Sequence, residues 1–183
     1  MSINSLILSS NSALPFVLLD QEAVLGYVPE VSFQCYPIMF QQTPNRKYEQ
    51  RIEAKSQLFV TSHRIIIMFL GHPQLENLII VYKQLTRDSE DIPPHLNMPW
   101  LGSNYLSWTF KVLSEQVGGN GPWLNYTYQW FCECYMEKKL ASGPLRINDI
   151  FHLRDTLRNA IVNYYKRLYS TQPEYEPLPV YTP

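Results

Sequence analysis

The clearest short motif in the chain is Leu178-Pro179-Val180-Tyr181, close to the last residue. Its spacing matches the Leu-Pro-x-Tyr form of the ligands that bind WW domains. In such a ligand a polyproline-II segment lays a proline against an aromatic groove, and a tyrosine two positions later enters a neighbouring pocket. Leu178, Pro179 and Tyr181 are therefore the candidate WW-binding residues. The alternative is a chance match, because the chain is rich in leucine, proline and tyrosine.

A second group of residues has the side chains needed to bind phosphate. Five basic residues lie in or near the polar stretch between residues 37 and 55, and we name them the basic set: Arg46, Lys47, Arg51, Lys55 and Arg64. A basic loop of this kind can hold a phosphoinositide headgroup at a membrane surface. The alternative is an ordinary solvated loop, because Glu49 and Glu53 are interleaved with the basic residues and cancel part of their charge.

Catalytic and metal-binding chemistry finds little support in the sequence. The four histidines are scattered, and none lies in a motif with a nucleophile and an acid. The glycine-rich stretch 118–122 lacks the lysine and the following helix of a phosphate-binding loop. Cys132 and Cys134 alternate as in a strand, and no second Cys or His pair has zinc-site spacing. The sequence therefore predicts a non-enzymatic protein with no metal site and no cofactor.

Length and composition favour one folded domain with a tail. The chain has 183 residues, of which 45% are hydrophobic and 14% aromatic, which is ample for a core. Its 15 Lys and Arg against 16 Asp and Glu argue against a direct nucleic-acid binder, whose affinity depends on neutralising phosphates. The first residues carry no basic leader region, and no apolar window approaches the roughly 20 residues of a membrane helix. We expect a soluble protein; the sequence does not predict its oligomeric state.

Short strands must position these residues, because most of the chain alternates between apolar and polar side chains. The run from Ser56 to Phe69 predicts two strands that meet at a turn near Ser62–His63. The segment 86–99 is expected to be a loop, and the aromatic run 126–136 should pair with the strand before it. The four tryptophans are expected in the core. The predicted strands are 24–36, 56–69 as a hairpin, 77–85, 105–113 and 126–136.

The period changes near Ile147, where apolar residues begin to recur at steps of three and four. This spacing predicts one amphipathic helix as far as Leu168, with Asn148 or Asp149 as its N-cap. Lys166 and Arg167 lie near its end, where the helix dipole favours cations. An apolar face of this length must be buried, and an open end or edge of the strands is the expected partner.

The order of elements, strands followed by one terminal helix, is that of the pleckstrin-homology superfold. Three stretches resemble the GRAM-like domain of the WW-domain-binding protein 2 family in matching order. The first is the hairpin Leu58–Met68, the second is Pro99-Trp100-Leu101-Gly102-Ser103-Asn104-Tyr105, and the third is the glycine-rich turn that ends at Trp123. The resemblance covers roughly residues 20–168. It implies a mainly β fold, a barrel of about seven strands capped by a C-terminal helix.

The resemblance also implies a function, namely an adaptor with a GRAM-like domain at 20–168 and a flexible tail at 169–183. Its expected partners are WW-domain proteins, such as a HECT-type ubiquitin ligase or a transcriptional regulator. A transcription-coactivator role and residence in cytoplasm and nucleus follow from the same resemblance. The second hypothesis is a peripheral membrane module that binds phosphoinositides through the basic set. The tail departs from the family pattern, because it has a single motif where the family has several Pro-Pro-x-Tyr repeats.

In the hairpin near Thr61, the residue types also allow a purely structural role. A threonine hydroxyl can cap neighbouring backbone groups, and a guanidinium can hold a carbonyl or a carboxylate. This interpretation takes Arg64 out of the basic set. The sequence leaves both roles of Arg64 open.

Overall fold

The computed structural model describes residues 2–9, 13–38, 51–86, 92–111, 129–136 and 140–170. Several predicted features lie outside these ranges: the Leu178–Tyr181 motif, Arg46 and Lys47 of the basic set, Trp123, and the glycine-rich turn. The strands are β1 (Ser2–Ile3), β2 (Val24–Pro37), β3 (Ile52–Thr61), β4 (Arg64–Phe69), β5 (Asn77–Val81), β6 (His95–Asn97), β7 (Tyr105–Lys111) and β8 (Gln129–Tyr135). A 3₁₀ turn η1 spans Tyr82–Gln84, and one helix, α1, spans Ile150–Ser170.

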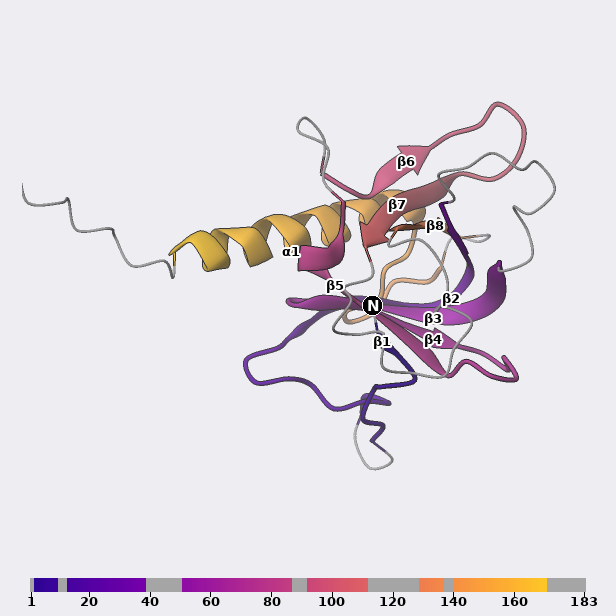
Figure 1. Cartoon of the computed structure of the whole chain (residues 1–183). Helices are drawn as coiled ribbons and strands as arrows, with labels where there is room; N and C mark the ends of the chain where they lie inside the picture. Colours follow the sequence, from indigo (N-terminus) through magenta and orange to yellow (C-terminus); the bar gives the residue numbers. More distant parts are fainter. Residues whose placement is uncertain are drawn as a thin grey trace, which may run out of the picture.

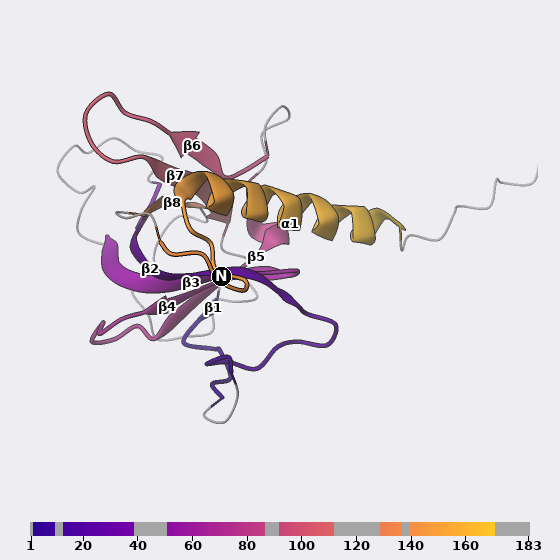
Figure 2. The same cartoon turned by 180° about the vertical axis from the view of Figure 1, so that it is seen from behind.

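All eight strands belong to one antiparallel sheet in the order β1-β5-β4-β3-β2-β8-β7-β6. Strand β2 connects the two halves, because it pairs with β3 from Val24 to Cys35 and with β8 from Ser32 to Pro37. Its register shifts between Val24 and Gly26 and between Val28 and Val31, and such irregularities bend a strand. The sheet is therefore strongly curved without closing into a barrel, and its halves form two layers with α1 along their open side (Figures 1 and 2).

The core lies between the two layers and the helix. Inward-facing residues of β2, β3, β4, β7 and β8 meet one stripe of α1, and the largest of them are fully buried. Trp108 and Trp130 are 1% exposed, which confirms their predicted core positions. The helix contributes the spaced residues Ile150, Leu153, Leu157, Ala160 and Ile161. The prediction of a mainly β, pleckstrin-homology-like sheet capped by a C-terminal helix is confirmed.

A second, smaller core covers the outer face of β3, β4 and β5. The chain before β2 folds over this face, where Phe16 packs edge-on against Phe59 at a centroid distance of 5.0 Å. Backbone hydrogen bonds from Val17 N–H to Ile7 O and from Ser9 N–H to Pro15 O hold this N-terminal segment together. Most of this segment lies before residue 20, and Phe16 in it is 2% exposed.

Helix α1 begins at Ile150, three residues after the change of period at Ile147. Asp149 is the N-cap, because its Oδ1 accepts a hydrogen bond of 2.8 Å from the backbone N–H of His152. Ile147 lies before the helix, in a short segment that pairs with the start of β2 through Tyr27. A Cβ atom on Gly26 would lie 2.8 Å from Ile147 Cδ1 and 2.9 Å from its Cγ1, so any other residue would force Ile147 to shift where this segment runs beside β2.

Two strand predictions need correction. The predicted strand 77–85 ends at Val81, and η1 follows, so the chain turns earlier than its run of apolar residues suggested. The predicted loop 86–99 contains β6, which pairs with β7 through His95↔Ser107 and Asn97↔Tyr105. In the part of the chain that the structure describes, no helix is long and apolar enough to cross a membrane.

Candidate interaction sites

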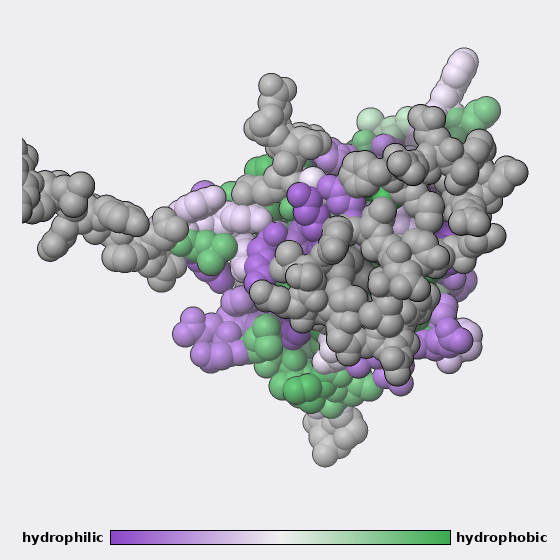
Figure 3. All heavy atoms as spheres, in the orientation of Figure 1, coloured by the Kyte–Doolittle hydropathy of each residue, from purple (hydrophilic) through white to green (hydrophobic). Residues whose placement is uncertain are grey.

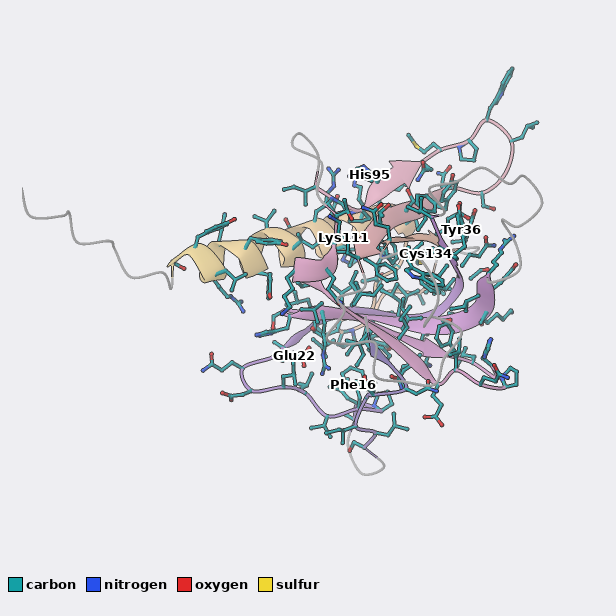
Figure 4. All side chains as sticks on the ribbon, viewed as in Figure 1. Phe16, Glu22, Tyr36, His95, Lys111 and Cys134 are labelled. Atoms are coloured by element: carbon teal, nitrogen blue, oxygen red, sulfur yellow. The ribbon has the colours of Figure 1, made fainter. Side chains whose placement is uncertain are left out.

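Arg64 is held in a buried ion pair. Its Nε lies 2.8 Å from Glu22 Oε1, its Nη2 lies 2.8 Å from Glu22 Oε2, and the two side chains are 9% and 0% exposed. Thr61 donates its hydroxyl to the same carboxylate and accepts the backbone N–H of Arg64 at 3.0 Å. Thr61 and Arg64 therefore have the structural role that their residue types allowed: the hydroxyl caps the turn and the guanidinium holds a carboxylate. Glu22, labelled in Figure 4, belongs to the N-terminal segment before β2, and Arg64 Nη2 also lies 3.4 Å from the backbone oxygen of Val17 in that segment.

The carboxylate of Glu22 stays ionised because its partners outweigh its burial. Burial alone would raise its pKa, but hydrogen bonds from Arg64, from the Leu19 N–H and from Thr61, together with the guanidinium charge, hold the pKa below its ordinary value. The sequence missed this pair, since Glu22 and Arg64 are far apart in the chain and nothing in the pattern around Glu22 marks it for burial.

Acid is expected to remove the stability that the Glu22 carboxylate contributes. Its folded-state pKa is lowered, so the unfolded chain binds this proton more readily, and the contribution is full above the ordinary glutamate pKa of about 4.3. It is lost as pH falls through the folded-state pKa. Urea unfolding of the wild type and of Glu22→Gln should show a stability difference that shrinks from about pH 6 to about pH 3. Parallel pH curves for the two proteins would contradict this assignment.

The other described members of the basic set lie elsewhere. Arg51 precedes β3 and pairs with Glu53 at 3.2 Å and with Gln34. Lys55 pairs with Glu30 at 2.8 Å, and both of these side chains are more than half exposed. Arg64 follows the opposite end of β3, which at about 3.3 Å per residue places it roughly 30 Å along the strand from Arg51. The structure therefore does not bring Arg64 together with Arg51.

The loop between β6 and β7 exposes apolar side chains. Trp100 is 100% exposed, Leu101 90% and Met98 64%. Figure 1 shows this loop projecting from the upper layer, and Figure 3 shows green, hydrophobic residues there behind a pale group of near-neutral hydropathy. The prediction that Trp100 lies in the core is wrong, because the residue belongs to the loop and not to a strand. We name residues 98–101 the apolar tip.

The outer face of β2, β8 and β7 carries a carboxylate among aromatic rings. Tyr135 donates its hydroxyl to Glu133 at 3.0 Å, and Tyr36 lies 3.5 Å from the other carboxylate oxygen. Burial, assisted by Glu133, raises the pKa of Tyr36 to about 12, and burial with the same neighbour also raises the pKa of Tyr135. Tyr135 stacks on Tyr105 at 4.8 Å. These contacts keep both tyrosines protonated and order the sheet face.

The three cysteines point into the core and are free thiols. Cys35 and Cys132 face each other across β2 and β8, with a sulfur–sulfur distance of 3.4 Å. Burial raises the pKa of Cys134 to about 12 and that of Cys132 well above its usual range, so neither supplies a thiolate near neutral pH. Among the described residues, no group of three or more His, Cys, Asp and Glu side chains is placed to hold a metal ion.

The last described residues belong to the end of α1. Residues 166–170 are all exposed, and the helix extends beyond the sheet on the side away from β2 and β8 (Figure 2). Arg167 lies in the last turn, as expected from the helix dipole. The Leu178–Tyr181 motif follows this exposed end in the sequence but lies outside the described residues.

Comparison with known proteins supports the fold and goes no further. No family model matches the chain, and no curated protein matches it either. A solved structure, the Vps36 N-terminal PH domain, is similar to this chain with a TM-score of 0.50 and 17% sequence identity. The similarity covers 88% of this chain and 94% of the Vps36 chain. At this identity the likeness shows a pleckstrin-homology-like fold alone.

Proposed function

We propose that the chain is a non-enzymatic adaptor, in which a pleckstrin-homology-like domain presents a C-terminal ligand for WW-domain proteins. The partners would be a HECT-type ubiquitin ligase or a transcriptional regulator, as the resemblance to the WW-domain-binding protein 2 family implies. The adaptor would act in the cytoplasm and the nucleus, and a role as transcription coactivator is part of the same proposal.

The observation that carries the proposal is the placement of the motif after an exposed helix end. Leu178, Pro179 and Tyr181 follow Ser170, the last residue of α1, and the final turn of that helix is exposed. The exposure of this helix end supports the proposal that a partner can reach the segment that follows it in the sequence. The motif itself supplies the chemistry, because proline fixes an extended backbone and the tyrosine ring fills an apolar pocket.

Tyr181→Ala is expected to weaken WW binding more than tenfold, because truncating an aromatic anchor typically costs about 2 kcal/mol or more. Wild-type binding through one motif should be modest, near −6 to −7 kcal/mol, which corresponds to a dissociation constant of roughly 10 μM. Fluorescence anisotropy with purified WW domains, together with pull-downs read by mass spectrometry, would measure both values.

Tyr169→Ala is the matched control, because it removes a tyrosine that is 67% exposed at the end of α1 and lies outside the motif. This variant should bind WW domains as the wild type does. If the Tyr181 and Tyr169 variants recover the same proteins from an extract, the motif is not the ligand and the adaptor proposal fails. Deleting residues 174–183 should abolish the same interaction.

A second candidate function is a peripheral membrane module that binds phosphoinositides. The exposed side chain of Lys55 and the partly exposed one of Arg51 support it, because both residues follow closely after Arg46 and Lys47 in the sequence. The pairing of both residues with glutamates weighs against it, since the local charge is partly cancelled. Deletion of the tail would leave this activity intact, which separates it from the adaptor function.

A further inference from the structure

We infer that the apolar tip, residues 98–101 between β6 and β7, inserts into the interfacial layer of a lipid bilayer. Its three largest side chains, Met98, Trp100 and Leu101, are all more than 60% exposed. Isolated exposed apolar residues are normal, but contiguous ones on a projecting loop mark an interaction surface. Trp100 is fully exposed, so its ring contributes no buried apolar area to the stability of the domain.

The base of the loop is held in place, so that the tip projects in a fixed direction. Asn97 donates its side-chain amide to Ser107 Oγ at 2.8 Å across the hairpin. Gly102 has a φ of +112°, a conformation that side chains disfavour, and it turns the chain back toward β7. The loop is therefore presented by paired strands, and insertion would not require the hairpin to unfold.

The charge of this segment suits a lipid surface. The sequence from residue 92 to residue 111 contains no Asp or Glu, and its only basic side chain besides His95 is Lys111, at the far end of β7. A carboxylate near the tip would oppose entry into the interface, so its absence from the whole hairpin removes that cost. On β8, which pairs with β7, the carboxylate of Glu133 is engaged by the hydroxyls of Tyr135 and Tyr36.

The positions of the aromatic residues also suit the boundary between a lipid bilayer and water. Trp100 lies at the tip, and the stacked pair Tyr105 and Tyr135 lies at the base, where the hydroxyl of Tyr135 bonds Glu133. Tryptophan and tyrosine concentrate where hydrocarbon meets water, because each has an apolar body and a polar group. The tip itself carries no charged side chain, and the polar residues beside it are the uncharged Asn97, Ser103 and Asn104, so it can enter the interfacial layer without burying a charge.

The N-terminal segment provides a matched control. Ile7 and Leu8 are 71% and 53% exposed on the outer face of β3 to β5. Figures 1 and 2 place this segment and the β6–β7 loop on opposite sides of the sheet. Ile7→Ala/Leu8→Ala therefore removes a comparable apolar area that could not reach a membrane contacted by the tip. The test pair is Trp100→Ala/Leu101→Ala, which changes exposed loop residues and should leave thermal unfolding unchanged.

The experiment is flotation of the full chain with phosphatidylcholine vesicles, with and without phosphatidylserine. The wild type and the Ile7/Leu8 variant should bind. The Trp100/Leu101 variant should lose at least about tenfold in partition coefficient, as expected when one or two large apolar side chains no longer leave water. In a Trp123→Phe background, bromine-labelled lipid should quench the fluorescence of Trp100, because Trp108 and Trp130 are buried. Adding Trp100→Phe to that background should remove the quenching while retaining most of the binding.

Three results would overturn the inference. The first is a wild type that fails to float with either vesicle composition, which would leave a protein partner as the occupant of the tip. The second is equal binding of the Trp100/Leu101 variant and the wild type. The third is loss of binding on charge reversal at Arg46, Lys47 and Arg51 without any effect of the tip, which would assign membrane contact to the basic set. Deleting residues 174–183 should not alter flotation, so this test and the WW test fail independently.

Discussion

Replacing Arg64 with alanine is expected to lower the free energy of unfolding by about 3–5 kcal/mol, because breaking one partner of a buried ion pair leaves the other charge uncompensated. Glu22 is fully buried, and both of its oxygens accept from the guanidinium. The same change also removes contacts between the β3–β4 hairpin and the N-terminal segment that covers the outer face of β3 to β5, because Glu22 belongs to that segment. Urea unfolding at neutral pH measures the loss.

Lys55→Ala is the matched control for an exposed ion pair. Lys55 and Glu30 are 66% and 57% exposed, so their interaction is screened and its removal should change stability by less than about 1 kcal/mol. The double variant Glu22→Leu/Arg64→Leu should recover much of the loss, since replacing both partners by apolar residues leaves no buried charge. A loss for Arg64→Ala as small as that for Lys55→Ala would show that the buried pair contributes little.

The sequence predicted the strands and the helix because their apolar residues follow a simple period. The hairpin from Ser56 to Phe69 is present with its turn at Ser62–His63, and α1 carries the expected stripe of buried residues. Apolar residues at every second position in a strand, or at steps of three and four in a helix, form a local pattern that can be found in one sequence alone. The bend of β2 is different, because it depends on pairing with β3 on one side and β8 on the other.

The sequence could not predict which polar residues are buried or which aromatic residues are exposed. Glu22 is buried because Arg64 reaches it from a hairpin far along the chain, and no local pattern shows that partner. Trp100 was assigned to the core because tryptophan is usually buried there, but its position between two paired strands leaves it in solvent. In both cases tertiary contacts, and not the residue type, decide the environment.

Proximity in the sequence also misled the grouping of the basic set. Arg51, Lys55 and Arg64 are close neighbours along the chain, but the ten residues of β3 lie between the first and the last of them. A strand separates residues faster than any other regular structure, so nearby charges need not share a surface. Arg51 and Lys55 remain candidates for contact with a headgroup, whereas Arg64 stabilises the fold.

The two proposals concern different parts of the chain. The proposed WW ligand follows the end of α1 in the sequence, and Figure 1 shows that helix end and the loop between β6 and β7 pointing to opposite sides of the molecule. A chain with both activities could hold a WW-domain protein at a membrane without competition between the two sites. Simultaneous binding would then raise the effective concentration of each partner, which compensates for two modest single affinities.

Leu157→Ala is expected to destabilise the domain by about 2–5 kcal/mol, because it removes methyl groups from a filled core and leaves a cavity. Leu157 is 0% exposed and packs beside Ile65 and Trp108, where α1 closes the open side of the sheet. Most of the stability of a single helix comes from such packing, so loss of this contact should loosen α1 as a whole. Thermal and urea unfolding would measure the change.

Asn163→Ala is the control on the same helix, because Asn163 is exposed and alanine has the higher helix propensity, so stability should hold or rise slightly. Leu157→Ala should nevertheless bind WW domains with unchanged affinity, since a short linear ligand needs no folded domain beside it. Vesicle binding should weaken instead as the fraction of folded protein falls, because β6 and β7 must be paired to present Trp100. If Leu157→Ala unfolded the domain and abolished WW binding together, the ligand would depend on the folded surface, and the motif alone would not explain recruitment.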